Sequence, residues 1–104
     1  MPKTDCDNRS LALSLSRLLS RRVRDHEIAV ALDLPVSTYG KRKDKVDFPT
    51  FDELRRVADR MGVDETVLLV DFGYLDITQL NDKLQQRYAA YRNAIDVIAS
   101  MRHD

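Results

Sequence analysis

Apolar side chains recur three or four positions apart along most of the chain, which is the spacing of helices that bury one face. The first such stripe consists of Leu11, Leu15, Leu18 and Leu19. It predicts a helix that begins near Ser10, with Asn8 or Ser10 as its N-cap. Residues 1–9 before this helix are polar, and we expect them to form a flexible tail.

Two short helices joined by a tight turn are predicted next. The first begins near Asp25 and the second spans residues 36–43. Asp33 lies at the turn, where aspartate tolerates a left-handed backbone better than most residues, and Pro35 suits the first turn of the following helix. The inward-facing residues of the two helices are predicted to be Ile28, Ala29, Leu32 and Tyr39.

A loop over residues 44–49 precedes a strongly amphipathic fourth helix. Thr50 and Glu53 form the sequence signature of a capping box, and Gly62 stands where a helix C-cap is expected. The predicted inward stripe of this helix is Phe51, Leu54, Val57, Ala58 and Met61. Asp64 can cap a short fifth helix that turns Val67, Leu68 and Leu69 inward and ends before Gly73.

The last segment, residues 76–102, contains neither glycine nor proline and predicts one long helix that begins near Asp76 or Thr78. Its apolar positions form a heptad-like seam of Ile77, Leu84, Tyr88, Tyr91, Ile95 and Ile98, with Asn81 in the vacant place. Such a seam predicts a contact between two helices. The contact would be either with a second copy of the chain or with its own domain, and the candidate contact residues are Leu84, Tyr88, Tyr91, Ile95 and Ile98.

The composition fits one all-α domain, residues 10–72, with an appended helix, because 104 residues leave no room for two full cores. No apolar run reaches the roughly 18 residues of a membrane span, and the N-terminal residues lack the hydrophobic stretch of a secretory signal. We therefore expect no membrane partner and a cytoplasmic location. The single cysteine, Cys6, agrees with a reducing compartment.

Charge is unevenly distributed although the formal net charge is zero. The segment from Arg9 to Lys45 carries nine cations and four acidic residues, a net charge of +5. The segment from Asp64 to Asp104 has four cations and seven acidic residues, a net charge of −3. A basic half joined to an acidic half is compatible with a surface that faces DNA. An uneven charge distribution is also common among helical proteins that do not bind DNA.

The third predicted helix has the form of a helix that enters a DNA major groove, with small polar residues followed by cations. In this context the order of five short helices resembles the Xre/Cro/phage-repressor family of helix-turn-helix domains. The residues that carry the resemblance are Glu27-Ile28-Ala29, Leu34, Tyr39, Phe48-Pro49-Thr50 and the block from Leu54 to Asp64. The chain departs from the family at the turn, where Asp33 replaces the usual glycine, and at Pro35, where serine or threonine is common.

The resemblance implies a five-helix lambda-repressor-like fold with an extended C-terminal helix, and double-stranded DNA as the partner. The residues it places against bases are Val36, Ser37, Thr38, Gly40 and Lys41. Those it places against phosphates are Arg24, His26, Arg42, Lys43 and Lys45. Asp25 would lower the affinity, because its carboxylate lies near the same phosphates.

Catalysis and metal binding are not expected. The two histidines are 77 positions apart and the only cysteine lies near the N-terminus, so no spacing typical of a metal site exists. The three scattered glycines form no phosphate-binding loop, and no G-x-S-x-G motif is present. We expect no cofactor and no small-molecule effector.

Two functions from different classes follow. The first is a sequence-specific DNA-binding transcriptional regulator, a repressor of the phage immunity or Cro type that occludes a promoter, with a possible homodimer through the C-terminal helix and half-sites one DNA turn apart. The second is an antitoxin-like module, or another interaction module of the same fold, that binds a partner protein through that helix. Antitoxins commonly bind their own promoter, so the two functions can coexist.

Overall fold

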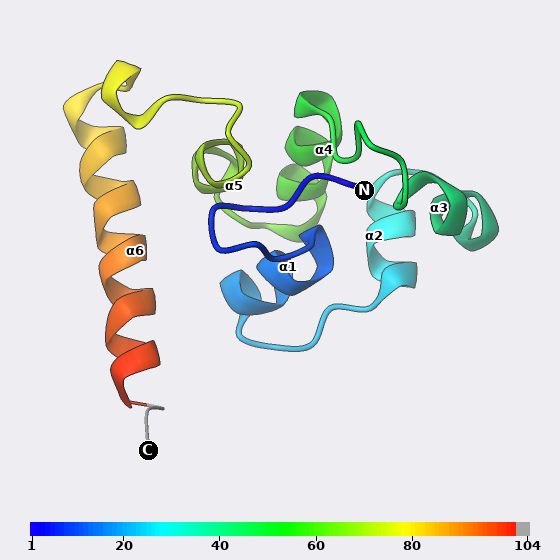
Figure 1. The fold of residues 1–104 in the computed structure, drawn as a ribbon, viewed down its shortest axis with the longest axis horizontal. Coiled ribbons are helices and arrows are strands. Elements are labelled where there is room, and N and C mark those ends of the chain that lie inside the picture. The colour runs from blue at the N-terminus through cyan, green and yellow to red at the C-terminus, as the bar shows by residue number, and fades with distance from the viewer. Residues whose placement is uncertain (102–104) are drawn as a thin grey trace.

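The computed structural model describes the backbone of residues 1–101 and the side chains of residues 1–97. Over this range the protein is helical and contains no strand, which confirms the all-α prediction. In chain order the elements are α1 (Leu11–Leu19), α2 (Asp25–Ala31), α3 (Val36–Arg42), α4 (Phe51–Met61), α5 (Glu65–Asp71), a 3-10 turn η1 (Ile77–Gln79) and α6 (Asp82–Met101). Helices α3 and α6 lie at opposite ends of the molecule (Figure 1).

Local capping interactions fix most helix ends where the sequence predicts them. The Ser10 hydroxyl accepts a hydrogen bond from the N–H of Leu13 at the start of α1, so Ser10 and not Asn8 is the N-cap. At α4, Thr50 and Glu53 form the predicted capping box. Gly62 ends that helix in the left-handed conformation, with a φ of 70°.

The turn between α2 and α3 has the conformation predicted for it. Asp33 adopts a φ of 57°, and the N–H of Leu34 donates to the carbonyl of Ala29 at 2.9 Å. Arg60 of α4 donates two hydrogen bonds to the Asp33 carboxylate, at 3.1 and 2.9 Å. Pro35 is the N-cap of α3 and so lies one position before the helix rather than in its first turn.

The core lies where α1, α2, α4 and α5 meet, and its most deeply buried large side chains include Leu15, Ile28, Leu54, Val57 and Leu68. Phe51 departs from its predicted inward position. The exposed fraction of this residue is 39%, and its ring meets that of Tyr74 edge-on with 5.9 Å between centroids. Phe51 is the first residue of α4, so it reaches only the rim of the core.

The N-terminal segment is held by specific contacts, which corrects the expectation of a flexible tail over residues 1–9. The Asp5 side chain is buried and accepts hydrogen bonds from the N–H groups of Asp7 and Arg9. The N–H of Lys3 donates to the carbonyl of Phe48 at 2.7 Å. A polar segment can pack in this way because the Asp5 carboxylate supplies acceptors for backbone N–H groups that have left water.

The C-terminal helix begins later than the sequence predicts. Residues 77–79 form the separate turn η1, so Ile77 is outside the long helix. The Asn81 side chain accepts a hydrogen bond from the N–H of Leu84 at 2.9 Å. Asn81 is therefore a cap that starts α6 and not a polar residue within a helical seam, as the heptad interpretation proposed.

Candidate nucleic-acid interface

Helix α3 is anchored on one side and exposed on the other. Tyr39 is 2% exposed, and its ring meets that of Phe48 edge-on with 5.8 Å between centroids. The predicted base-facing residues Val36, Ser37, Thr38 and Lys41 are exposed. The structure thus places these four on an outer surface that the domain itself does not cover, which is the arrangement that base contacts require.

Gly40, the fifth predicted base-facing residue, is partly exposed and lies within α3. A Cβ atom added there would meet no heavy atom within 4 Å. The fold therefore gives no steric reason for a glycine, even though glycine costs about 1 kcal/mol in a helix interior.

Three of the predicted DNA-contacting cations and the predicted phosphate-facing His26 lie at the surface around α2 and α3. Arg24 and His26 are exposed at the start of α2, and Lys41 and Lys45 are exposed at the end of α3 and just after it. None of the four side chains has a hydrogen-bond or ion-pair partner among the residues that the structure describes. They remain available for a polyanion.

Arg42, by contrast, is engaged within the domain. Its guanidinium forms two hydrogen bonds with the Glu53 carboxylate, at 2.9 and 2.6 Å, and a third with Asp47 at 2.6 Å. Burial tends to raise the pKa of Glu53, but its hydrogen bonds with Arg42 and Thr50 outweigh this effect and hold that pKa below its ordinary value. Arg42 thus joins α3 to the capping box of α4, which makes it a poor phosphate ligand.

Lys43 is also paired, although less firmly. Its ammonium lies 2.7 Å from the carboxylate of Asp25, and the exposed fractions of the two side chains are 38% and 46%. The hydrogen bond with Asp25 raises the pKa of Lys43 above its ordinary value. Asp25 is the first residue of α2. An exposed pair of this kind is weak, so a phosphate can compete for Lys43.

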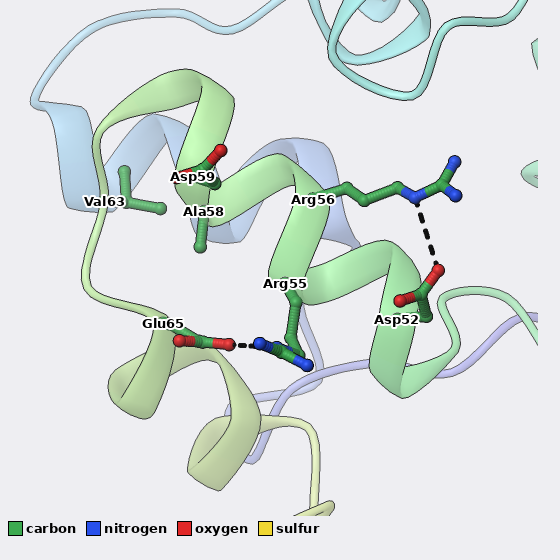
Figure 2. A pocket seen from close by; sticks show the side chains of 7 residues that line it. All are labelled: Asp52, Arg55, Arg56, Ala58, Asp59, Val63 and Glu65. Carbon is green, nitrogen blue, oxygen red and sulfur yellow. Dashed lines mark hydrogen bonds and ion pairs between the residues drawn. The ribbon is translucent and has the colours of Figure 1, made fainter.

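A hollow of about 560 Å³ lies on the outside of α4 and α5 (Figure 2). Arg55 pairs with Glu65 at 2.6 Å, and Arg56 lies 3.3 Å from Asp52. Because both arginines of this hollow are paired with carboxylates, it offers neither a basic track for DNA nor an apolar surface for a ligand. Its lining residues are Asp52, Arg55, Arg56, Ala58, Asp59, Val63 and Glu65.

The predicted contact face of α6 packs against the protein's own domain. The Tyr88 hydroxyl donates to the buried Asp71 carboxylate of α5 at 2.5 Å, and Arg92 donates two hydrogen bonds to Asp7 at 2.8 and 3.2 Å. The predicted contact residues Leu84, Tyr88, Tyr91 and Ile95 are half-buried there. The side chain of Ile98 lies outside the described part of the chain. The heptad-like seam predicted a contact either with a second copy of the chain or with the protein's own domain. The contact with its own domain is present.

The polar groups that hold α6 were not identified in the sequence. Asp71 and Arg92 carry no local motif, and each finds its partner on a segment distant in the chain. Burial raises the pKa of Asp71, and the hydrogen bond from Tyr88 opposes that rise. These side chains fasten the N-terminal segment and α6 to the body of the protein.

Within the described residues, no group of histidine, cysteine, aspartate or glutamate side chains is arranged to hold a metal ion. Among the described helices, none combines the length and apolar character needed to cross a membrane. Comparison of the chain with protein-family models, with curated proteins and with solved structures gives no match.

Proposed function

We propose that the protein is a sequence-specific DNA-binding regulator of transcription that inserts α3 into the major groove of double-stranded DNA. The observation that carries the proposal is the exposure of α3. The helix is fixed to the domain through Tyr39, while Ser37, Thr38 and Lys41 face outward without partners among the described residues. A rigid helix that presents short hydrogen-bonding side chains suits contact with base edges.

The proposed division of roles differs from the one that the sequence predicts. Lys41 lies on α3 and is proposed to contact a base, while Arg24, His26 and Lys45 are exposed and are proposed to contact phosphates. Arg42 holds α3 in position, and Lys43 contributes only by exchanging Asp25 for a phosphate. Few phosphate contacts are therefore expected, with a correspondingly modest dependence of affinity on salt.

The regulator is proposed to be a repressor of the phage immunity or Cro type that acts by occluding a promoter. The support is the resemblance of the residues from Glu27 to Asp64 to the Xre/Cro family, together with the tight turn at Asp33 between α2 and α3. A small domain bound in the groove excludes polymerase by occupancy alone.

The antitoxin-like alternative receives less support. It requires the seam of α6 to be available to a partner protein, whereas Tyr88 and Arg92 are bonded to Asp71 and Asp7 of the same chain. A partner would have to displace these contacts or use the outer side of the helix.

A competition binding assay tests the proposal. Labelled DNA from upstream of the protein's own gene would compete with a shuffled duplex of equal composition at about 150 mM salt. We expect a preference of about a hundredfold or more, since specific sites are bound roughly 10³-fold or more tightly than random DNA in typical cases. We expect Ser37→Ala combined with Lys41→Ala to reduce that preference.

Lys83→Ala provides the matched control, because Lys83 is an exposed lysine at the start of α6, away from α3. It should leave the preference unchanged. Equal, salt-sensitive binding to both duplexes would reduce the surface to a general phosphate-binding face. Absence of binding to either would favour a partner protein.

A further inference from the structure

Val36 is an exposed apolar residue at the beginning of α3. Its exposed fraction is 56%, and it is the first residue of the helix, next to Ser37. It does not contribute to the core, unlike Tyr39 of the same helix. An exposed valine also adds little to helix stability, because its branched side chain is restricted at χ1. Its place on the outer surface of α3 leaves its methyl groups accessible to a ligand of this helix.

The ion pairs of the domain leave α3 with little capacity for reading bases through charge. Lys41 is the only long cation among the predicted base-facing residues, and the neighbouring Arg42 is bonded to Glu53 and Asp47. The predicted base-facing residues also include no arginine, asparagine or glutamine, so Lys41 is the one side chain among them that can contact a guanine through its charge. Discrimination at the other base pairs of the site must therefore depend on other chemistry.

The hydroxyls of Ser37 and Thr38 do not fill this role alone. A hydroxyl both donates and accepts, so it can bond the O4 acceptor of thymine as readily as the N4 donor of cytosine. For a surface that reads these bases through hydroxyls, the C5-methyl group of thymine is the remaining feature that separates them in the major groove, and an apolar side chain recognises it.

We infer that Val36 reads the C5-methyl group of a thymine, and thereby sets the base preference of α3 near the N-terminal end of the helix. This inference rests on the proposed DNA-binding function. The methyl group also occurs on 5-methylcytosine. Thymine is the favoured source, because it is a standard base of every DNA duplex, whereas 5-methylcytosine arises only where a cytosine has been methylated.

The test uses the full chain and the tightest-binding duplex selected from a random pool. Each thymine is replaced singly by deoxyuridine, which removes only the methyl group. At one position in each site we expect a three- to fivefold loss of affinity, about the value for one buried methyl group. Val36→Ala should bind the thymine and uracil duplexes equally, and Val36→Thr, which keeps one methyl group, should show a reduced difference.

Val97→Ala is the matched control, because Val97 is 51% exposed on α6, at the end of the molecule opposite to α3 (Figure 1). It should retain the full uracil effect. At the same position, 5-methylcytosine paired with guanine should bind more tightly than cytosine, and thymine at least as tightly as 5-methylcytosine. Tighter binding to 5-methylcytosine than to thymine would overturn the assignment to thymine.

The outcomes separate the inference from the proposed function. If the wild type selects no duplex from the pool, both are overturned. If it selects one but no thymine-to-uracil replacement alters its affinity, or if the replacement affects Val36→Ala as strongly as the wild type, the inference alone is overturned. Circular dichroism should show the same helix content for all three variants, since Val36 and Val97 are both exposed.

Discussion

Arg42 and Lys41 are adjacent cations at the end of α3 with opposite expected roles. Lys41 is exposed, whereas Arg42 is bonded to Glu53 and Asp47. The exposed fraction of the Glu53 side chain is 16%, so removal of its partner leaves a largely buried carboxylate without a compensating charge. Stability is therefore expected to depend on Arg42, and affinity for DNA on Lys41.

Arg42→Ala should lower the free energy of unfolding by roughly 1–3 kcal/mol, the range for a lost hydrogen bond to a charged group. Lys41→Ala should change it by less than about 0.5 kcal/mol, as surface substitutions usually do. Urea denaturation followed by circular dichroism measures both. Equal stability of the two variants would contradict the role assigned to Arg42.

Gly40→Ala separates stability from binding at a single position. The fold leaves room for the added methyl group. Alanine in a helix interior is favoured over glycine, so the free energy of unfolding should rise by about 0.5–1 kcal/mol. Binding to the selected duplex should nevertheless weaken, if the backbone approaches the bases at Gly40. A stabilised variant with unchanged affinity would assign the glycine no part in binding.

Among the helices, α6 is held to the body mainly through polar contacts. Arg92 donates two hydrogen bonds to Asp7, and Tyr88 donates one to Asp71. The hydrogen bonds from Arg92 hold the pKa of Asp7 at about 2, below its ordinary value of 3.8. Because this pKa is lowered on folding, the stability it provides is present above pH 3.8 and is lost as the pH falls toward 2.

Asp7→Asn should therefore destabilise the protein by about 1–2 kcal/mol at pH 6, and the difference from the wild type should shrink as the pH falls from 4 toward 2. The raised pKa of Asp71 changes stability with pH in the opposite direction. Asp71 is present in both the wild type and Asp7→Asn, so its effect cancels from the difference in the free energy of unfolding. Denaturant unfolding at a series of pH values measures the effect. A difference that stays constant down to pH 2.5 would refute the role of the Asp7–Arg92 pair.

The elements differ in how far the sequence predicts them. The bounds of α1, α4 and α5 follow from caps such as Ser10, Thr50 and Asp64, whose partners lie two or three residues away, so local chemistry determines them. The start of α6 was predicted too early, because Asn81 fits both a heptad seam and an N-cap.

In the candidate site, too, the sequence predicts local features but not contacts between distant residues. The exposure of α3 follows from the position of Tyr39 in its helix, which periodicity reveals. The pairing of Arg42 does not, because Glu53 is eleven positions away and the contact depends on how α3 and α4 pack. The anchoring of the N-terminal segment joins residues as distant as Asp7 and Arg92, for which the sequence carries no signal.

For the molecule as a whole, the positions of α3 and α6 restrict how two copies could share one DNA site. The two helices lie at opposite ends of a molecule whose Cα extents are 37 × 37 × 25 Å (Figure 1). Copies joined through the outer side of α6 would hold their α3 helices apart by more than one DNA turn, ~34 Å. The expected spacing of one turn does not fit a dimer of this kind.

Duplexes with two copies of the selected site test this geometry. With sites about 10.5 base pairs apart, one DNA turn, we expect no cooperativity that depends on α6. Gel-shift titrations of the wild type and of Val97→Asp measure it, because Val97 is exposed on the outer side of α6. Cooperative binding at one-turn spacing that Val97→Asp abolishes would show that α6 does join the two copies there.

Helix α3 is proposed to be the element that recognises DNA sequence, and selection from a pool of random duplexes with the wild type and with Lys41→Gln tests this role. We predict that the wild type enriches one motif, and that Lys41→Gln changes the preferred base at one position, from guanine toward adenine, while the rest of the motif persists. No enriched motif, or an identical motif for both proteins, would contradict this role of α3.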